Sequence, residues 1–189
     1  MTLSPTASQT VGPYLHLGLT QITMPDIAKD ASRGEKIVIT GRVLDGEGQP
    51  IPDALLEFWQ ANAAGKYAHT EDTQDKPLDG SFHGFGRVPT DKTGAFRFAT
   101  VKPGAVPGPG NSWQAPHIVV CLFMRGMLRQ LYTRIYFSDE AGNADDPVLG
   151  LIPDQSRRTT LVAQRESGQA EYRWNIVMQG EKETVFFDC

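Results

Sequence analysis

The sequence predicts an all-β fold, namely a β-sandwich with long loops and few short helices. Most of its periodic segments are short and alternate between apolar and polar residues, which is the pattern of half-buried strands. About seven such segments are separated by loops rich in glycine and proline, as in proteins built from two packed sheets. With 189 residues, of which 40% are hydrophobic, the chain is long enough for one domain with a sizeable core.

The elements follow in order along the chain. Residues 1–30 have little core-forming pattern, so we expect an N-terminal arm that is either disordered or packed on a partner chain, followed by one sandwich domain over residues 31–189. Residues 35–45 and 53–61 flank the turn "GEGQP" and predict a hairpin-like pair of strands. Further strands are expected at these segments: 94–101, 117–124, 130–137, 170–179 and 183–187.

Two long loops and two short helices complete the predicted fold. Residues 62–88 show little apolar periodicity, and residues 102–116 are rich in proline and glycine. Long ordered loops in a single domain are usually functional or interfacial. The helical candidates are residues 24–31 and 153–164.

Charge and cysteine content narrow the class of protein. A net charge of −4 gives no electrostatic reason to expect nucleic acid or an anionic membrane as a partner. The two cysteines, Cys121 and Cys189, do not suggest a disulfide framework, which fits a reducing compartment. Because the first residues lack a basic stretch followed by a long apolar run, we expect no signal peptide and a cytoplasmic protein.

His117 raises the question of a metal site. It lies where the loop "NSWQAP" runs into the apolar strand "HIVVCLF". A metal-binding strand would often carry a second imidazole two residues further on, because that side chain points to the same face. The residue at that position is Val119.

Several longer motifs point to a family. The segments "GRVLDGEGQPIPDALLEFWQANAAGKYAH", "GRVPTDKTGAFRFATVKPG", "APHIVVCLFMRG" and "QGEKETVFFD" resemble the intradiol ring-cleaving dioxygenases, essentially from end to end. The resemblance implies a β-sandwich that binds a non-haem ferric ion through two tyrosines and two histidines. It also implies cleavage of a catechol between its two hydroxylated carbons with both atoms of dioxygen, a step of aromatic catabolism in the β-ketoadipate pathway.

With the N-terminal motif "SQTVGPYLHLGL", the sequence is most similar to the alpha chains of the two-chain members of this family. In those members an iron-bearing beta chain is the partner, and the two chains form one active site at their interface. The resemblance therefore implies Fe3+ on the partner, small aromatic substrate and dioxygen as further partners, and a higher hetero-oligomer of alpha–beta units.

The four ligand positions of the family can be read in this sequence by resemblance. The tyrosine positions are occupied by Tyr67 and Val106, and the histidine positions by His117 and Val119. A family arginine before the histidines is replaced by Gln114. Since valine has no donor atom, we interpret Tyr67 and His117 as remnants whose polar atoms are hydrogen-bonded beside a filled-in pocket, with no metal on this chain.

The same resemblance assigns substrate contacts to this chain. The implied substrate, 3,4-dihydroxybenzoate, carries a carboxylate, which an arginine can bind through two parallel hydrogen bonds. Arg125 has this role by resemblance, with Arg129 and Arg134 as alternatives; an arginine merely exposed in a turn is the other interpretation. On the arm, the resemblance implies that these residues line the shared site: Thr10, Gly12, Pro13 and Tyr14.

Three hypotheses are open at this stage. The first is an iron-free alpha subunit of an intradiol dioxygenase. The second is a self-sufficient enzyme that uses Tyr67 and His117, with His69 as a possible replacement ligand. The third is a non-enzymatic, transthyretin-like β-sandwich that serves as a binding module. Iron and turnover in the chain alone would support the second hypothesis, iron and activity only together with a beta chain would support the first, and secretion would support the third.

Overall fold

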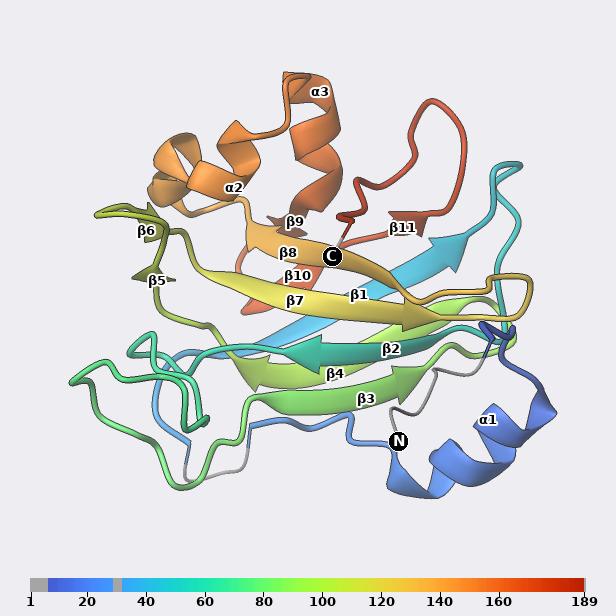
Figure 1. Ribbon diagram of the computed structural model, residues 1–189, viewed down its shortest axis with the longest axis horizontal. Helices are drawn as coiled ribbons and strands as arrows, with labels where there is room; N and C mark the ends of the chain where they lie inside the picture. Colours follow the sequence, from blue (N-terminus) through green and yellow to red (C-terminus); the bar gives the residue numbers. More distant parts are fainter. Residues whose placement is uncertain (1–6, 29–31, 189) are drawn as a thin grey trace, which may run out of the picture.

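The computed structural model describes residues 7–28 and 32–188 and shows two sheets packed face to face (Figure 1). Hydrogen bonds connect the strands in the order β11-β1-β10-β9-β8-β7-β2-β3, and β4 pairs with β1. The strands are β1 (Lys36–Leu44), β2 (Leu55–Trp59), β3 (Phe85–Pro89), β4 (Ala95–Val101), β5 (Val106–Pro107), β6 (Trp113–Gln114), β7 (His117–Phe123), β8 (Leu131–Phe137), β9 (Val162–Arg165), β10 (Glu171–Arg173) and β11 (Ile176–Val177). The predicted β-sandwich is thereby confirmed.

The predicted pairing of the first two strands is wrong. A tight turn does follow β1, where the Asp45 amide donates to the Gln49 carbonyl at 2.9 Å. The chain then crosses to the other sheet, where β2 pairs with β3 and β7, whereas β1 pairs with β4, β10 and β11. β1 and β2 each have one apolar face. These two faces pack against each other across the core, so the strands are not hydrogen-bonded neighbours in one sheet.

Aromatic rings from the two sheets meet in the core. Phe58 of β2 and Phe98 of β4 are fully buried, and their ring centroids lie 3.8 Å apart. Phe96 and Trp174 extend this layer, with ring centroids 6.4 Å apart. Alternating side chains of β2 and β4 are therefore committed to the core, which leaves the remaining side chains of β2 on the outer face.

The helices are short, as predicted, but their positions differ from the expected ones. They are α1 (Pro13–Leu19), η1 (Thr20–Ile22), η2 (Ala141–Asp145), α2 (Pro147–Gly150), α3 (Gln155–Arg158) and η3 (Thr159–Leu161). The expected helix over 153–164 is limited to α3 and η3, and its last residues form β9. No helix in the described ranges has the length and apolarity needed to cross a bilayer.

The expected helix over residues 24–31 is wrong for residues 24–28, and residues 29–31 lie outside the described part. The Met24 amide donates to Arg87, and the Ile27 amide donates to Ala99, both at 2.8 Å. Ile27 is buried. Pairing with the sheets satisfies these backbone amides and buries Ile27, so the segment is extended.

The two ends of the sandwich differ in what surrounds them (Figure 1). Because β2 and β7 are antiparallel, the end of β2 and the start of β7 lie at the same end, near β5, β6 and the loop after β2. At the other end, the turn over residues 124–130 connects β7 to β8. The described part of the N-terminal arm contacts that turn, since Thr10 is hydrogen-bonded to Gly126.

Candidate functional site

The four ligand positions inferred from the sequence line one cavity of about 440 Å³. This cavity, which we call the remnant pocket, lies on the outer face of the sheet formed by β2, β7 and β8. The sequence predicted that the pocket beside Tyr67 and His117 would be filled in, whereas the structure has an open cavity there. Its lining residues include Trp59, Tyr67, His69, Val106, Gln114, His117, Val119 and Arg134.

Strand register explains why three of these side chains lie side by side. Val119 is the Cα partner of Trp59 on one side and of Arg134 on the other. Side chains directly opposite each other on neighbouring strands share a face. His117 lies two residues before Val119 and so projects to the same face. The outer face of the sheet thus carries the indole of Trp59, the imidazole of His117 and the guanidinium of Arg134 around Val119.

The environment of His117 fixes its protonation state. Its side chain is buried, and Nδ1 lies 2.8 Å from the Ala115 carbonyl oxygen. Since a carbonyl oxygen only accepts, Nδ1 carries the proton and Nε2 is an acceptor. Burial, together with the nearby Arg134 charge, lowers the pKa of His117 to about 4. The imidazole is therefore neutral at physiological pH.

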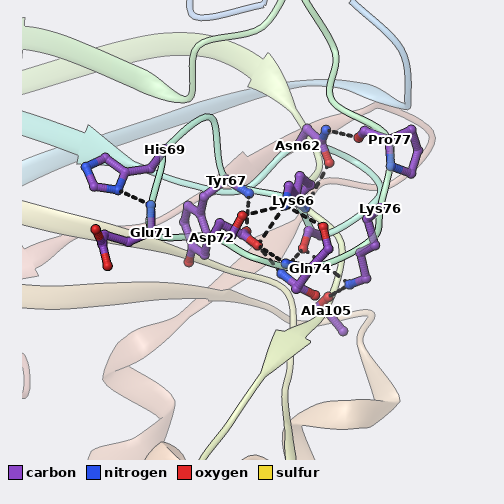
Figure 2. A network of polar contacts seen from close by, with 11 residues as sticks. Asn62, Lys66, Tyr67, His69, Glu71, Asp72, Gln74, Lys76, Pro77 and Ala105 are labelled. Atoms are coloured by element: carbon purple, nitrogen blue, oxygen red, sulfur yellow. Dashed lines mark hydrogen bonds and ion pairs between the residues drawn. The ribbon is translucent and has the colours of Figure 1, made fainter.

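Tyr67 is presented by a loop that is held by its own polar network (Figure 2). At its centre, Lys66 and Asp72 form an ion pair of 3.1 Å whose side chains are 9% and 7% exposed. The Tyr67 amide donates to Asp72 at 2.8 Å, and the Gln74 amide donates to the same carboxylate at 3.0 Å. Burial alone would raise the pKa of Asp72, but these hydrogen bonds and Lys66 lower it to about 2.

Two further features keep this loop close to β5. Gly65 has a φ of +76°, and a Cβ there would lie 2.0 Å from the Ala105 carbonyl oxygen, so only glycine fits. The Asn62 side chain accepts from the amide of Lys66 (Figure 2). It also accepts from the amide of Ala64. The shape of the loop is thus set by contacts that need no metal.

The Tyr67 ring itself packs on Trp59. Their centroids lie 5.9 Å apart with an interplanar angle of 15°, which is a stacked arrangement. Burial raises the pKa of the Tyr67 phenol above its ordinary value. A neutral phenol stacked on an indole is a wall of the pocket rather than a charged ligand.

The donor set of the remnant pocket does not suit ferric iron. Ferric iron favours phenolate and imidazole, and the residues at two of the four positions, Val106 and Val119, have no donor atom. His69 is no replacement ligand in this arrangement, because its Nδ1 already accepts from the Glu71 amide at 3.2 Å. Within the described residues, no three His, Cys, Asp or Glu side chains are grouped so that they could hold a metal ion.

The residues expected to contact substrate lie at the other end of the sandwich. The Arg125 side chain is 73% exposed, and its Nε lies 2.8 Å from Asp53 Oδ2. Next to it, Gly126 has a φ of +86°, and its amide donates to Thr10 Oγ1 at 2.8 Å. We call Thr10, Gly12, Asp53, Arg125 and Gly126 the arm-side cluster.

The remaining expected residues are placed as follows. Gly12 is exposed, and its carbonyl accepts from the Leu15 amide at 3.0 Å. Pro13 and Tyr14 begin α1, but their side chains lie outside the part of the chain that is described. Of the alternative arginines, Arg129 is exposed in the turn after β7, whereas Arg134 lies in the remnant pocket.

The two regions are too far apart to form one site within a single chain. Val119 lies four residues before the end of β7 at Phe123, or about 13 Å at the rise of a strand, and Arg125 lies beyond that end in the turn. Each region must therefore act separately or with another molecule.

Comparison with known proteins agrees with the resemblance seen in the sequence. A family model described as Dioxygenase matches residues 11–180. The chain is 44% identical to the protocatechuate 3,4-dioxygenase alpha chain of Pseudomonas putida, over 98% of this chain and 97% of that protein. It is 38% identical to the beta chain of the Burkholderia cepacia enzyme, over 94% of this chain and 77% of that protein.

The chain belongs to the dioxygenase family. The fold agrees, since 3-chlorocatechol 1,2-dioxygenase from Rhodococcus opacus 1CP superposes with a TM-score of 0.64 at 22% identity, over 93% of this chain and 67% of that one. The proteins of this family named here are oxidoreductases that act on aromatic rings. Membership does not favour the non-enzymatic, transthyretin-like alternative.

Two residues of this dioxygenase chain were missed or misplaced by sequence reasoning. Asp53 lies within one of the segments that resemble the family but has no role assigned there, and its contact with Arg125 depends on β2 and β7 being neighbours. Arg134 was considered only as a substitute for Arg125, although its position opposite Val119 places it in the remnant pocket. Register between β7 and β8 is the signal that would have located it.

Proposed function

We propose that this chain is the alpha subunit of a protocatechuate 3,4-dioxygenase, without iron of its own. With an iron-bearing beta subunit it forms the shared active site for intradiol cleavage of 3,4-dihydroxybenzoate by dioxygen to 3-carboxy-cis,cis-muconate. One observation carries the proposal: the chain is 44% identical to an alpha chain along nearly its whole length, and two of its four ligand positions are valine.

In this proposal Arg125 recognises the substrate carboxylate. Asp53 occupies Nε of the guanidinium, which leaves Nη1 and Nη2 available to a carboxylate. A guanidinium held in this way loses less conformational freedom on binding. The non-haem Fe3+ of the beta subunit would supply the oxygen chemistry, and this chain would orient the ring relative to it.

The N-terminal arm is proposed to pack on the beta subunit, with Thr10, Gly12, Pro13 and Tyr14 as walls of the shared site. Its described part carries apolar side chains that nothing in the described chain covers. Leu17 is 70% exposed, Ile22 49% and Met24 42%. Neighbouring exposed apolar residues of this kind are typical of a protein–protein interface. The resulting alpha–beta units are proposed to assemble further into a hetero-oligomer in the cytoplasm.

Iron content and oxygen uptake test the proposal directly. The chain is expressed alone and together with a beta subunit, and protocatechuate-dependent oxygen uptake is measured for both preparations. Iron and activity in the co-expressed material only are expected. Stoichiometric iron and turnover in the lone chain would contradict the proposal and support the self-sufficient enzyme.

A further inference from the structure

Among the described residues, Arg134 is a cation of the remnant pocket that forms no ion pair. Its Nη1 donates to Gln114 Oε1 at 2.7 Å and contacts the Tyr136 hydroxyl at 3.4 Å. Both partners are neutral, and no carboxylate pairs with Arg134 within the described residues. A partly buried guanidinium is stabilised best by an anion with two oxygens.

Two of the three carboxylates in or near the pocket are engaged by other groups; the third is Glu71, an exposed residue of the lining. Asp72 is paired with Lys66 and accepts backbone hydrogen bonds in the loop that carries Tyr67. Asp146 is buried and accepts from the amides of Ala115, Val148 and Leu149 and from the Tyr136 hydroxyl. Asp72 and Asp146 are therefore committed elsewhere, and the exposed Glu71 forms no ion pair with Arg134 among the described residues, so the charge is available to a molecule that enters the pocket.

Part of the pocket lining is aromatic and apolar and suits a flat ring, whereas the lining also includes the polar residues His69, Glu71 and Gln74. Trp59 and Tyr67 present stacked rings, while Val106 and Val119 occupy the positions where donors are missing. A volume of about 440 Å³ lies within the usual range of small-molecule sites. His117 adds a neutral ring whose Nε2 accepts no hydrogen bond from the described residues.

We propose that the remnant pocket binds a small planar aromatic carboxylate, with the carboxylate on Arg134 and the ring against Trp59 and the two valines. The role is binding only, since no group in the pocket can activate dioxygen. This site is separate from the proposed shared active site, because Arg125 lies in the turn beyond the opposite end of β7.

Benzoate is the probe, and the full-length chain is titrated with it by calorimetry and by ligand-observed NMR. Saturable binding to the wild-type chain is expected. Arg134→Gln should weaken it at least about tenfold, because a charge-assisted contact is lost. Benzamide has the same shape as benzoate without the charge, so it should bind the wild-type chain more weakly than benzoate by a similar factor. Arg129→Gln, at an exposed arginine of the turn after β7, is the matched control and should leave binding unchanged.

A second variant shows whether loss of binding comes from the pocket itself or from a failure to fold. Val119→Phe fills the cavity without removing Arg134, so benzoate binding should be lost while the thermal unfolding temperature stays close to that of the wild type. Absence of saturable binding to the wild-type chain would overturn the proposal. So would binding retained in both variants, or binding lost in Arg125→Gln but kept in Arg134→Gln. None of these outcomes affects the iron and oxygen-uptake test of the shared active site.

Discussion

The remnant pocket and the arm-side cluster show two ways in which one chain can carry part of a site. The remnant pocket is formed within one chain, with His117 4% exposed in its lining and Lys66 8% exposed in the loop that carries Tyr67. The arm-side cluster is open, with the Arg125 side chain 73% exposed and held only at Nε. The first is complete in shape but lacks donors, and the second has its donors but needs another surface to form a pocket.

The difference shows that shape and chemistry are maintained by different residues. Contacts of Lys66, Asp72 and Asn62 hold the loop that carries Tyr67, and none of these is a ligand position. Two donors can therefore be absent without collapse of the cavity. At the arm-side cluster, by contrast, Thr10 and Asp53 contact the turn that carries Arg125, so positioning and recognition depend on the same few contacts.

Restoring the two missing donors should produce the largest change. Val106→Tyr combined with Val119→His supplies a second phenolate and a second imidazole at positions that line the same cavity as Tyr67 and His117. We expect the chain alone to change from background iron to iron that remains bound through gel filtration, because a full set of hard oxygen and nitrogen ligands is present. Metal analysis and the visible absorption of ferric tyrosinate report the result.

The controls for this experiment are the two single variants and Val162→His, a half-buried valine of β9 that does not line the pocket. Each single variant should bind iron less firmly than the double variant. Equal iron in the Val162→His chain, or a folded double variant without iron, would show that the remnant pocket has lost more than two donors.

His117 should make stability depend on pH. Its folded pKa of about 4 lies below the unfolded value near 6.5, so the unfolded chain takes up a proton first. Stability is therefore lost as pH falls from about 6.5 to about 4, by roughly 3 kcal/mol in total. Urea unfolding measured across this range should show the slope in the wild-type chain and a much smaller one in His117→Gln.

The matched control is His83→Gln, because His83 is exposed on the loop before β3. That variant should keep the wild-type slope. If His117→Gln also keeps it, the imidazole is not the neutral, buried group that the structure describes, and the inference that Nε2 is an acceptor in the pocket fails with it.

Arg125→Ala tests the arm-side cluster in the complex with a beta subunit. Loss of one charge-assisted contact to the substrate carboxylate costs about 1.5–3 kcal/mol, so KM should rise tenfold or more while iron content stays normal. Arg129→Ala, in the same turn, should have little effect. An unchanged KM in the Arg125 variant would remove this residue from substrate recognition.

Much of the fold could be predicted because the segments are strongly periodic. Strands β1, β4, β7 and β8 lie where alternation or an apolar run predicted them. Strand β3 was missed because "FGRVP" combines glycine and proline in five residues, and its order comes from pairing with β2. The pairing of β1 with β2 was wrong because a short turn fixes the direction of a chain but not the sheet to which it continues.

The site was only partly predictable for a related reason. Motifs identified the four ligand positions, and the structure places them around one cavity. Arg134 could not be assigned to that cavity, because a shift of one residue in the register of β7 and β8 would move its side chain to the other face. Asp53 and Arg125 are 72 residues apart in sequence and meet only through the sheet.

Asp53→Asn should give the smallest effect and the finest test of how the arm-side cluster works. The Arg125 side of the pair is 73% exposed and the Asp53 side 21%; ion pairs at the surface contribute about 0–1 kcal/mol, so KM of the complex should rise only about two- to fivefold. Glu183→Gln, which breaks an exposed pair with Arg157 elsewhere, is the matched control. In an Arg125→Ala background the Asp53 change should have no further effect on KM, because a positioning residue acts only through the group it positions. An undiminished effect in that background would instead mean that Asp53 acts on the shared site independently of Arg125, and the arm-side cluster would then contain two separate contributors rather than one held guanidinium.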